Sequence, residues 1–131
     1  MSADEQRKLA AIMFTDMVGY SALSQRDEKL AQELLEEHRR LLREIFPRFN
    51  GTEIKTIGDA FLVEFGSALE AAQCAIEIQR TLAKRNADIA PDRRIELKIG
   101  ARTLLLKQLA RSGKKECKSS RTTGRRYVSS P

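Results

Sequence analysis

The sequence predicts an α+β domain of the ferredoxin-like class, a split-βαβ sandwich, and three observations lead to that prediction. The chain has 131 residues, which is enough for one small domain with its own core. Apolar runs and amphipathic segments in residues 1–100 follow the order strand, helix, strand, strand, helix, strand. Two right-handed crossovers in that order place the third strand between the first and the second, antiparallel to both.

The first half of the domain combines a buried strand with an amphipathic helix. Residues 9–16 are nearly all apolar, which is typical of a strand that is buried on both faces. Beyond Gly19, Ser24 with Asp27 resembles a capping box that starts a helix, and Pro47 ends this helix. The expected apolar face of the helix consists of Leu30, Leu34, His38, Leu41, Leu42 and Ile45.

A hairpin follows, and its turn carries an acidic residue. Residues 52–57 and 60–65 read as strands that flank Gly58-Asp59, a two-residue turn signal. In the predicted sheet, the start of the third strand lies beside the end of the first strand. We therefore expect Asp59 in the turn and Asp16 at the exit of the first strand at the same edge of the sheet.

A second helix and a last strand complete the domain. Ser67 and Glu70 form a second capping box. Residues 94–99 alternate strictly between polar and apolar side chains, which predicts a half-buried strand. The second helix is expected to bury Leu69, Ala72, Ile76 and either Leu82 or Ala83.

The charge of the chain is unevenly distributed. Of 24 basic and 18 acidic side chains, nine basic residues and one acidic residue fall in residues 101–131. We therefore expect two units, a domain in residues 1–100 and a basic tail that is disordered or extends the last strand through Leu104–Leu106. Tyr127 is the one aromatic residue of the tail, so the tail predicts no specific nucleic-acid site.

Composition also predicts where the protein resides. No apolar run approaches the roughly 20 residues of a transmembrane helix, and the N-terminus shows no secretory signal. The two cysteines, Cys74 and Cys117, cannot form a disulfide framework. These features predict a cytoplasmic protein with no membrane span in this chain.

The two carboxylates at one sheet edge suggest a metal site. Mg²⁺ and Mn²⁺ are hard cations that take oxygen ligands and keep positions open for phosphate and water. The segment after Asp16 leads toward a helix, where backbone N–H groups can receive phosphate oxygens and Gly19 permits close approach. Together these features indicate chemistry on a nucleoside triphosphate with two ions about 4 Å apart.

Two motifs resemble a known family. Phe14-Thr-Asp-Met-Val-Gly-Tyr-Ser21 and Lys55-Thr-Ile-Gly-Asp-Ala-Phe61 are similar to two motifs of the class III adenylate and guanylate cyclases. The resemblance runs through residues 9–100 and implies the nucleotide cyclase fold. Both motifs occur in order and at a suitable separation, which makes the match far more specific than a lone glycine pattern.

The resemblance implies roles for the residues that match these motifs. Asp16 and Asp59 correspond to the two metal aspartates, and the Met17 carbonyl corresponds to a further ligand. Lys55 matches the position that selects the base, where lysine favours adenine and glutamate favours guanine. The residues that correspond to the substrate site are Lys55, Val18, Gly19, Tyr20, Ser21 and Gly58.

The implied reaction converts ATP to cyclic AMP and pyrophosphate for intracellular signalling. Two divalent ions, Mg²⁺ or Mn²⁺, assist attack of the ribose 3′-hydroxyl on the α-phosphorus. Members of the family work as head-to-tail homodimers with the active site at the interface. The resemblance therefore also implies a homodimer, or pairing with another cyclase chain.

The likeness ends near Gly100. The family continues with an Ile-His-x-Gly-Asp/Glu-Val stretch and later an Asn-x-x-x-Arg pair, and neither has a counterpart here, so the C-terminal portion of the domain is missing from the match. A reading-frame change near Ala101 is one hypothesis for this departure. Without the arginine that stabilises charge on the α-phosphate, we expect the chain alone to bind metal and ATP weakly and to turn over little or nothing.

Other interpretations stay open at this point. Taken singly, Asp16 and Asp59 are ordinary turn residues, Lys55 is a solubilising charge on an edge strand, and His38 is a packing residue. A second hypothesis is a non-catalytic module of the same fold that pairs with an intact cyclase chain. A third, a cyclase that makes cyclic dinucleotides, ranks lower because its Gly-Gly-Asp/Glu-Glu-Phe hairpin reads Ile57-Gly-Asp-Ala-Phe61 here.

Overall fold

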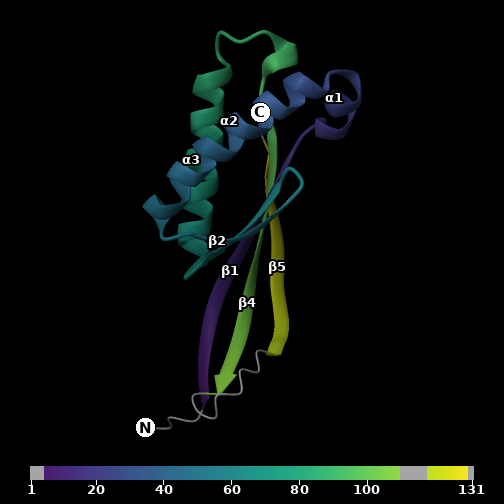
Figure 1. The fold of residues 1–131 in the computed structure, drawn as a ribbon. Helices are drawn as coiled ribbons and strands as arrows, with labels where there is room; N and C mark the ends of the chain where they lie inside the picture. Colours follow the sequence, from purple (N-terminus) through teal and green to yellow (C-terminus); the bar gives the residue numbers. More distant parts are fainter. Residues whose placement is uncertain (1–4, 110–117, 130–131) are drawn as a thin grey trace.

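The computed structural model describes the backbone of residues 5–109 and 118–129 and the side chains of residues 10–103 (Figure 1). In chain order its elements are β1 (Glu5–Met17), α1 (Tyr20–Arg26), α2 (Glu28–Ile45), the 3₁₀ turn η1 (Phe46–Phe49), β2 (Thr52–Ile57), β3 (Ala60–Phe65), α3 (Ala68–Asn86), the 3₁₀ turn η2 (Pro91–Arg93), β4 (Leu97–Leu109) and β5 (Lys118–Ser129).

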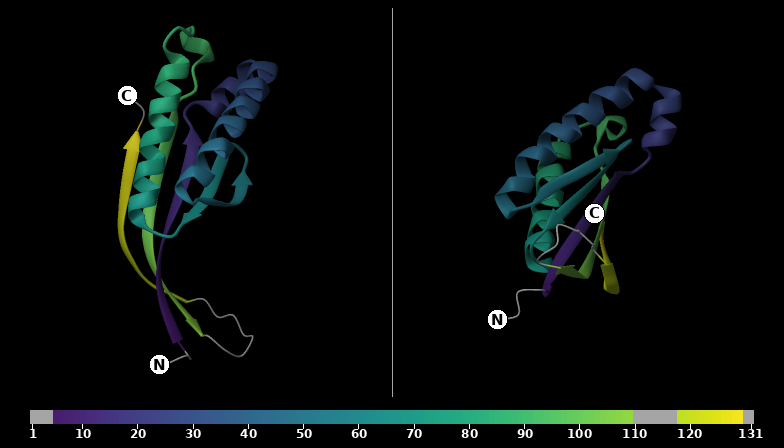
Figure 2. Two further views of the ribbon diagram at one scale, coloured as in Figure 1. Left: turned by 90° about the vertical axis from the view of Figure 1, so that its left-hand side faces the viewer. Right: turned by 60° about the horizontal axis from the view of Figure 1, so that its bottom comes forward.

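The sheet has the predicted topology. Its strand order is β2-β3-β1-β4-β5, and each neighbouring pair is antiparallel. The third strand lies between the first and the second, which confirms the split-βαβ prediction. Helices α2 and α3 lie on the same side of the sheet, and β1, β4 and β5 extend beyond them as a long curved ribbon (Figure 2).

The core lies between these two helices and the sheet. Helix α2 buries most of the predicted face, and Leu41 is half-buried. Among the described side chains, β1, β3 and β4 contribute alternate residues to the core, because every second side chain of a strand points to the helices. The strand residues of the core include Met13, Phe61, Val63, Phe65, Leu97 and Ile99.

The start of the first helix differs from the prediction. Ser24 lies inside the short helix α1, and Asp27 is the N-cap of α2, where its carboxylate accepts a hydrogen bond from Leu30 N at 3.1 Å. The chain therefore forms two helices where the sequence pattern suggested one. A carboxylate is the stronger N-cap because it satisfies a first-turn N–H and favours the positive end of the helix.

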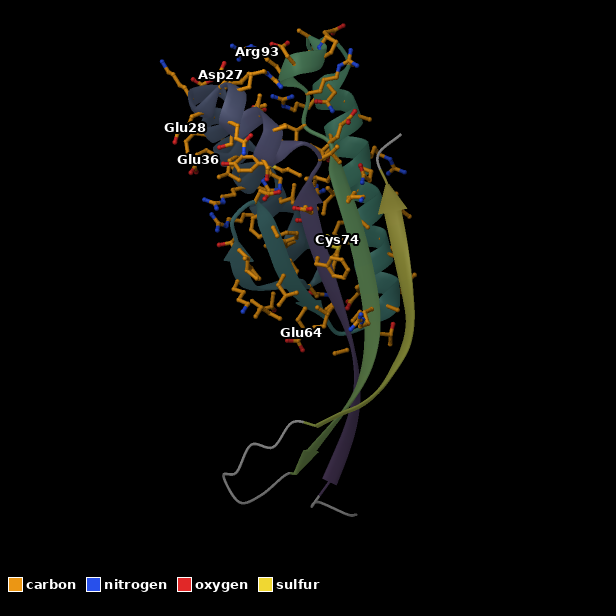
Figure 3. All side chains as sticks on the ribbon, turned by 90° about the vertical axis from the view of Figure 1, so that its right-hand side faces the viewer. Asp27, Glu28, Glu36, Glu64, Cys74 and Arg93 are labelled. Carbon is orange, nitrogen blue, oxygen red and sulfur yellow. The ribbon has the colours of Figure 1, made fainter. Side chains whose placement is uncertain are left out.

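The predicted buried face of α3 is largely wrong. Leu69 is 66% exposed and Ile76 is 52% exposed, and Ala72 and Ala83 are also exposed, so Leu82 alone was predicted correctly. Apolar residues occur on two sides of this helix, and periodicity alone could not choose between them. The buried side consists of Ala71, Cys74, Ala75, Ile78, Gln79 and Leu82 (Cys74 is labelled in Figure 3). Its small residues allow α3 to pack close to the sheet.

The hairpin and the second helix cap agree with the prediction. Residues 52–57 and 60–65 are β2 and β3, and Gly58 in the turn has the left-handed φ of 59° that a two-residue turn favours. Ser67 Oγ accepts a hydrogen bond from Glu70 N at 3.1 Å. The turn that carries Asp59 is therefore built by local sequence signals.

The basic tail contributes strands. Beyond residue 100, β4 continues to Leu109 beside β1, and β5 pairs with β4 from Lys98↔Ser129 to Lys107↔Lys118. Residues 104–106 lie within β4, in line with the expected strand extension, and the expectation of disorder for the tail stays a prediction. That residues 1–100 and 101–131 are separate units stays a prediction. Within the described residues, no helix combines the length and the hydropathy that a membrane crossing requires.

Candidate functional site

Asp16 and Asp59 meet at one edge of the sheet. Asp59 Oδ2 accepts a hydrogen bond from the backbone N–H of Met17 at 2.8 Å, across 42 residues of sequence. The same contact places the Asp59 carboxyl beside that of Asp16. The pKa of Asp16 is raised, first by a hydrogen bond with the Asp59 side chain, then by burial and by the Asp59 charge. The two carboxylates are therefore close enough to compete for a proton.

The alternation of β1 explains why Asp16 faces outward. Thr15 and Met17 are buried toward the helices, so Asp16 between them points to the open face of the sheet. Asp59 reaches the same place because the β2–β3 turn lies beside the end of β1 (Figure 1). Strand alternation and topology together produce the pair.

Lys98 is a residue of this site that the sequence analysis missed. It pairs with Asp16 across the β1–β4 ladder, and its positive charge lowers the pKa of Asp16 against the effect of Asp59. The exact register of β1 and β4 was needed to find it. The alternation of residues 94–99 indicated a strand but did not say which residue lies opposite Asp16.

The donor set fits a divalent ion. Two adjacent carboxylates supply hard oxygen ligands, and their mutual repulsion favours a bound positive charge. Among the described residues no group of three or more His, Cys, Asp or Glu side chains is placed to hold a metal ion. The remaining ligands of an ion at Asp16 and Asp59 must therefore be backbone carbonyls, water or substrate oxygens, as is usual for Mg²⁺.

The segment after β1 forms the start of α1. Gly19 is its N-cap with a left-handed φ of 74°, and a Cβ there would meet nothing within 4 Å. The backbone conformation therefore favours glycine at this position, and the close approach of a phosphate to Gly19 stays a prediction. Tyr20 and Ser21 follow in the first turn, where N–H groups have no acceptor inside the helix. The N–H of Val18 donates to Glu96 O at 2.8 Å and is engaged within the chain.

Lys55 lies on the same face of the sheet as Asp16. It is exposed on β2 just after a bulge, and it pairs with Leu62 on β3. Leu62 pairs with Phe14 on β1, two residues before Asp16, so all four side chains share the face opposite the helices. The structure therefore brings Asp16, Asp59 and Lys98 together and leaves Lys55 two strands away on their side.

Of the carboxylate pair, Asp16 is exposed and Asp59 is half-buried. Two hollows of the described residues, of about 290 and 220 Å³, are lined by the C-terminal half of α3 and by the segments around Gly19 and Asp92, and neither includes Asp16 or Asp59. Two exposed apolar side chains lie close to the pair along the chain, Val18 two residues after Asp16 and Ile57 two residues before Asp59. This arrangement differs from a site enclosed by one chain.

His38 and Cys74 carry no chemistry in this structure. His38 is fully buried and packs on Phe61 with ring centroids 5.4 Å apart, and burial lowers its pKa to about 4. The imidazole is therefore neutral near pH 7, in agreement with a packing role. Burial raises the pKa of Cys74 to about 12, which makes the thiol unreactive. Cys117 lies outside the described residues.

Comparison with known proteins shows which family this chain is similar to. The model of the adenylate and guanylate cyclase catalytic domain matches residues 3–105. A Rhizobium meliloti protein named "Putative adenylate cyclase 3" is 43% identical over 96 residues, which cover 72% of this chain and 16% of that protein. This chain therefore spans less than a fifth of that relative.

Solved structures of cyclase domains are also similar to this chain. The adenylate/guanylate cyclase/hydrolase from Silicibacter pomeroyi superposes with a TM-score of 0.70 at 30% identity, over 89% of this chain and 66% of that chain. The adenylyl cyclase CyaB from P. aeruginosa shares the fold with a TM-score of 0.63 at 22% identity, over 79% of this chain and 60% of that chain. The chain described here belongs to the adenylate and guanylate cyclase catalytic domain family.

Proposed function

We propose that this chain carries the metal-binding half of an adenylate cyclase active site, which converts ATP to cyclic AMP and pyrophosphate. The observation that carries the proposal is the contact of Asp59 Oδ2 with Met17 N, which sets the Asp59 carboxyl beside that of Asp16. The name of the Rhizobium meliloti relative favours adenylate over guanylate cyclization. Lys55, which matches the lysine of adenine-selective members, favours it as well.

Each residue of the site has a defined task in this proposal. Asp16 and Asp59, with the carbonyl of Met17, hold two divalent ions, Mg²⁺ or Mn²⁺. When bound, these ions lower the pKa of the ribose 3′-hydroxyl and neutralise charge on the leaving pyrophosphate. Lys98 offers a positive charge to the phosphates beside Asp16. Lys55 donates a hydrogen bond to adenine N1, which guanine cannot accept because its N1 carries a proton.

The triphosphate lies against the start of α1 in this proposal. Backbone N–H groups of Gly19, Tyr20 and Ser21 face the phosphate oxygens, together with the peptide of Gly58 on the facing hairpin. Val18 contributes its N–H only if the hydrogen bond to Glu96 O is released on binding. These groups hold the nucleotide while the two aspartates hold the metal.

The proposed site requires a second chain for full activity. Residues 101–131 contain no asparagine, so the family's Asn-x-x-x-Arg pair cannot come from this segment. The exposed Val18 and Ile57 lie two residues after Asp16 and two residues before Asp59, and they form an apolar rim that another cyclase domain can cover. A second copy of residues 101–131 supplies no such pair either, so the proposed active assembly pairs this chain with a cyclase chain that carries it. The homodimer that the family resemblance implies is proposed for the arrangement of the domains only. The proposed conversion of ATP to cyclic AMP implies a role in signalling in the cytoplasm.

Binding of Mn²⁺ and a non-hydrolysable ATP analogue tests the proposal. Isothermal titration of the 131-residue chain and of its Asp16→Asn, Asp59→Asn and Asp88→Asn variants measures both ligands. The two site variants lose metal-dependent nucleotide binding, and Asp88→Asn on the exposed loop after α3 keeps it. Equal binding by all four proteins would eliminate the metal assignment.

A second candidate function is a non-catalytic module that pairs with an intact cyclase chain. The same apolar rim favours it, because an open site with an exposed border can dock on another domain without turnover. Mixing this chain with a full-length homologue distinguishes the two: an active metal site raises the activity of the mixture, and Asp16→Asn with Asp59→Asn abolishes the increase. An effect that survives both substitutions supports the non-catalytic module.

A further inference from the structure

Helix α2 holds the β2–β3 hairpin at three places. Arg39 Nη2 donates to the carbonyl of Gly58 at 2.8 Å. Arg43 donates through Nε and Nη2 to the carboxylate of Glu53 at 2.9 and 3.0 Å. The guanidinium of Arg43 also lies 5.4 Å from the ring centre of Phe61. Because β2 is an edge strand that pairs with β3 alone, these contacts hold the hairpin against the helix layer.

The contact of Arg39 differs from the others because it acts on the turn. The Gly58 carbonyl belongs to the same planar peptide unit as the N–H of Asp59. A hydrogen bond to this carbonyl therefore fixes the orientation of the peptide that leads into the Asp59 Cα. The Asp59 side chain then reaches Met17 N at 2.8 Å, next to Asp16. Two hydrogen bonds, joined by the Gly58–Asp59 peptide and the Asp59 side chain, thus connect α2 to the carboxylate pair.

We propose that Arg39 is a positioning residue, which sets the place of the Asp59 carboxylate relative to Asp16 by holding the Gly58 carbonyl. Its side chain is 24% exposed, and Glu36 lies 3.7 Å from its Nη1, so the guanidinium is oriented from one side by an acid. Bonds to groups that orient metal ligands are commonly worth about 10- to 100-fold in metal affinity. The consequence for metal binding rests on the proposed function, whereas the hold on Asp59 does not.

Arg43 supplies a matched control. It lies one turn further along the same helix and binds the same hairpin, but its partner Glu53 is near the far end of β2. A purely structural role of the α2–hairpin contacts predicts that Arg39→Gln and Arg43→Gln have similar effects. A positioning role predicts that Arg39→Gln alone changes the site.

The experiment compares Arg39→Gln, Arg39→Lys and Arg43→Gln in the 131-residue chain. Mn²⁺ affinity, hydrogen exchange of the Met17 amide and thermal unfolding are measured for each protein. We expect Arg39→Gln to weaken Mn²⁺ binding by about 10-fold or more and to speed exchange of the Met17 amide. Arg39→Lys, which keeps a long, positively charged donor where the glutamine amide is shorter and neutral, restores part of both. Arg43→Gln lowers thermal stability to a similar extent and changes Mn²⁺ affinity less than about threefold.

Two results would overturn the inference: wild-type Mn²⁺ affinity in Arg39→Gln, or equal weakening in both glutamine variants. Failure of the proposed function has a different signature. In that case Mn²⁺ binding is absent from the parent chain, or it survives Asp16→Asn and Asp59→Asn. The hydrogen-exchange rate of the Met17 amide is then the only test of the positioning role. Faster exchange in Arg39→Gln than in Arg43→Gln supports this role, and equal rates refute it.

Discussion

Replacing Asp16 by asparagine is expected to stabilise the metal-free chain while removing metal binding. In the folded protein the neighbouring Asp59 raises the pKa of Asp16, so two carboxylates repel each other when both are ionised. Asparagine keeps the shape of the side chain and can donate its amide N–H to Asp59. The substitution therefore removes a repulsion and keeps the hydrogen bond.

The magnitude follows from the exposure of the pair. Asp16 is exposed, so solvent screens the repulsion to the scale of surface charge pairs, about 0.5–1 kcal/mol. For a domain of this size, that corresponds to a rise of roughly 2–6 °C in the unfolding temperature. A larger gain would require a more deeply buried pair than the structure shows.

The sign of the pH dependence is fixed by the direction of the shift. A carboxyl whose pKa is raised on folding is favourable to stability while it is protonated, and this contribution is lost as the pH rises through the raised pKa. The advantage of Asp16→Asn is therefore present at pH 7 and vanishes at low pH, below the ordinary pKa of aspartate.

Thermal unfolding followed by circular dichroism checks this prediction. The parent chain, Asp16→Asn and the loop control Asp88→Asn are compared at pH 7 and at about pH 3.5, in the presence of a chelator. A less stable Asp16→Asn variant at pH 7, or the same gain at both pH values, would refute the reasoning.

Three further predictions concern the turn, the helix pair and the base. Gly58→Ala should cost about 1–2 kcal/mol in urea unfolding and Gly58→Asn less, because φ is 59° and no atom lies within 4 Å of an added Cβ; equal costs would contradict the backbone explanation. Glu37→Gln should cost about 1–2 kcal/mol, because Arg85 donates to the Glu37 carboxylate at 2.6 and 2.7 Å and lowers its pKa. This stability is present above the unfolded pKa of glutamate and is lost as the pH falls through the lowered one, so a difference that persists in acid speaks against it. Lys55→Glu should shift nucleotide competition from ATP toward GTP, and an unchanged preference would remove Lys55 from the base site.

Much of the fold could be predicted because its signals are local. Gly58-Asp59 between two alternating runs specifies a hairpin, and Ser67 with Glu70 specifies a helix start. The meeting of Asp16 with Asp59 then follows from topology alone, since one crossover order places a strand end beside a turn. The meeting of the two carboxylates was therefore predictable from the sequence.

Other features depend on interactions that the sequence pattern does not encode. Leu69 and Ile76 look like core residues, but α3 carries apolar residues on two sides and the sheet accepts the side with small residues. Asp27 separates α1 from α2 through a capping bond. Lys98 and Arg39 reach the site through strand register and helix placement, which are tertiary properties.

Paramagnetic broadening by Mn²⁺ tests the central claim most directly, because it reports where the ion binds without requiring turnover. Substoichiometric Mn²⁺ is added to the isotope-labelled chain with and without an ATP analogue. We expect the amide signals of Met17, Asp59 and Lys98 to broaden first and Asp59→Asn to abolish this pattern. Broadening centred elsewhere in the chain, or an unchanged pattern in Asp59→Asn, would contradict it.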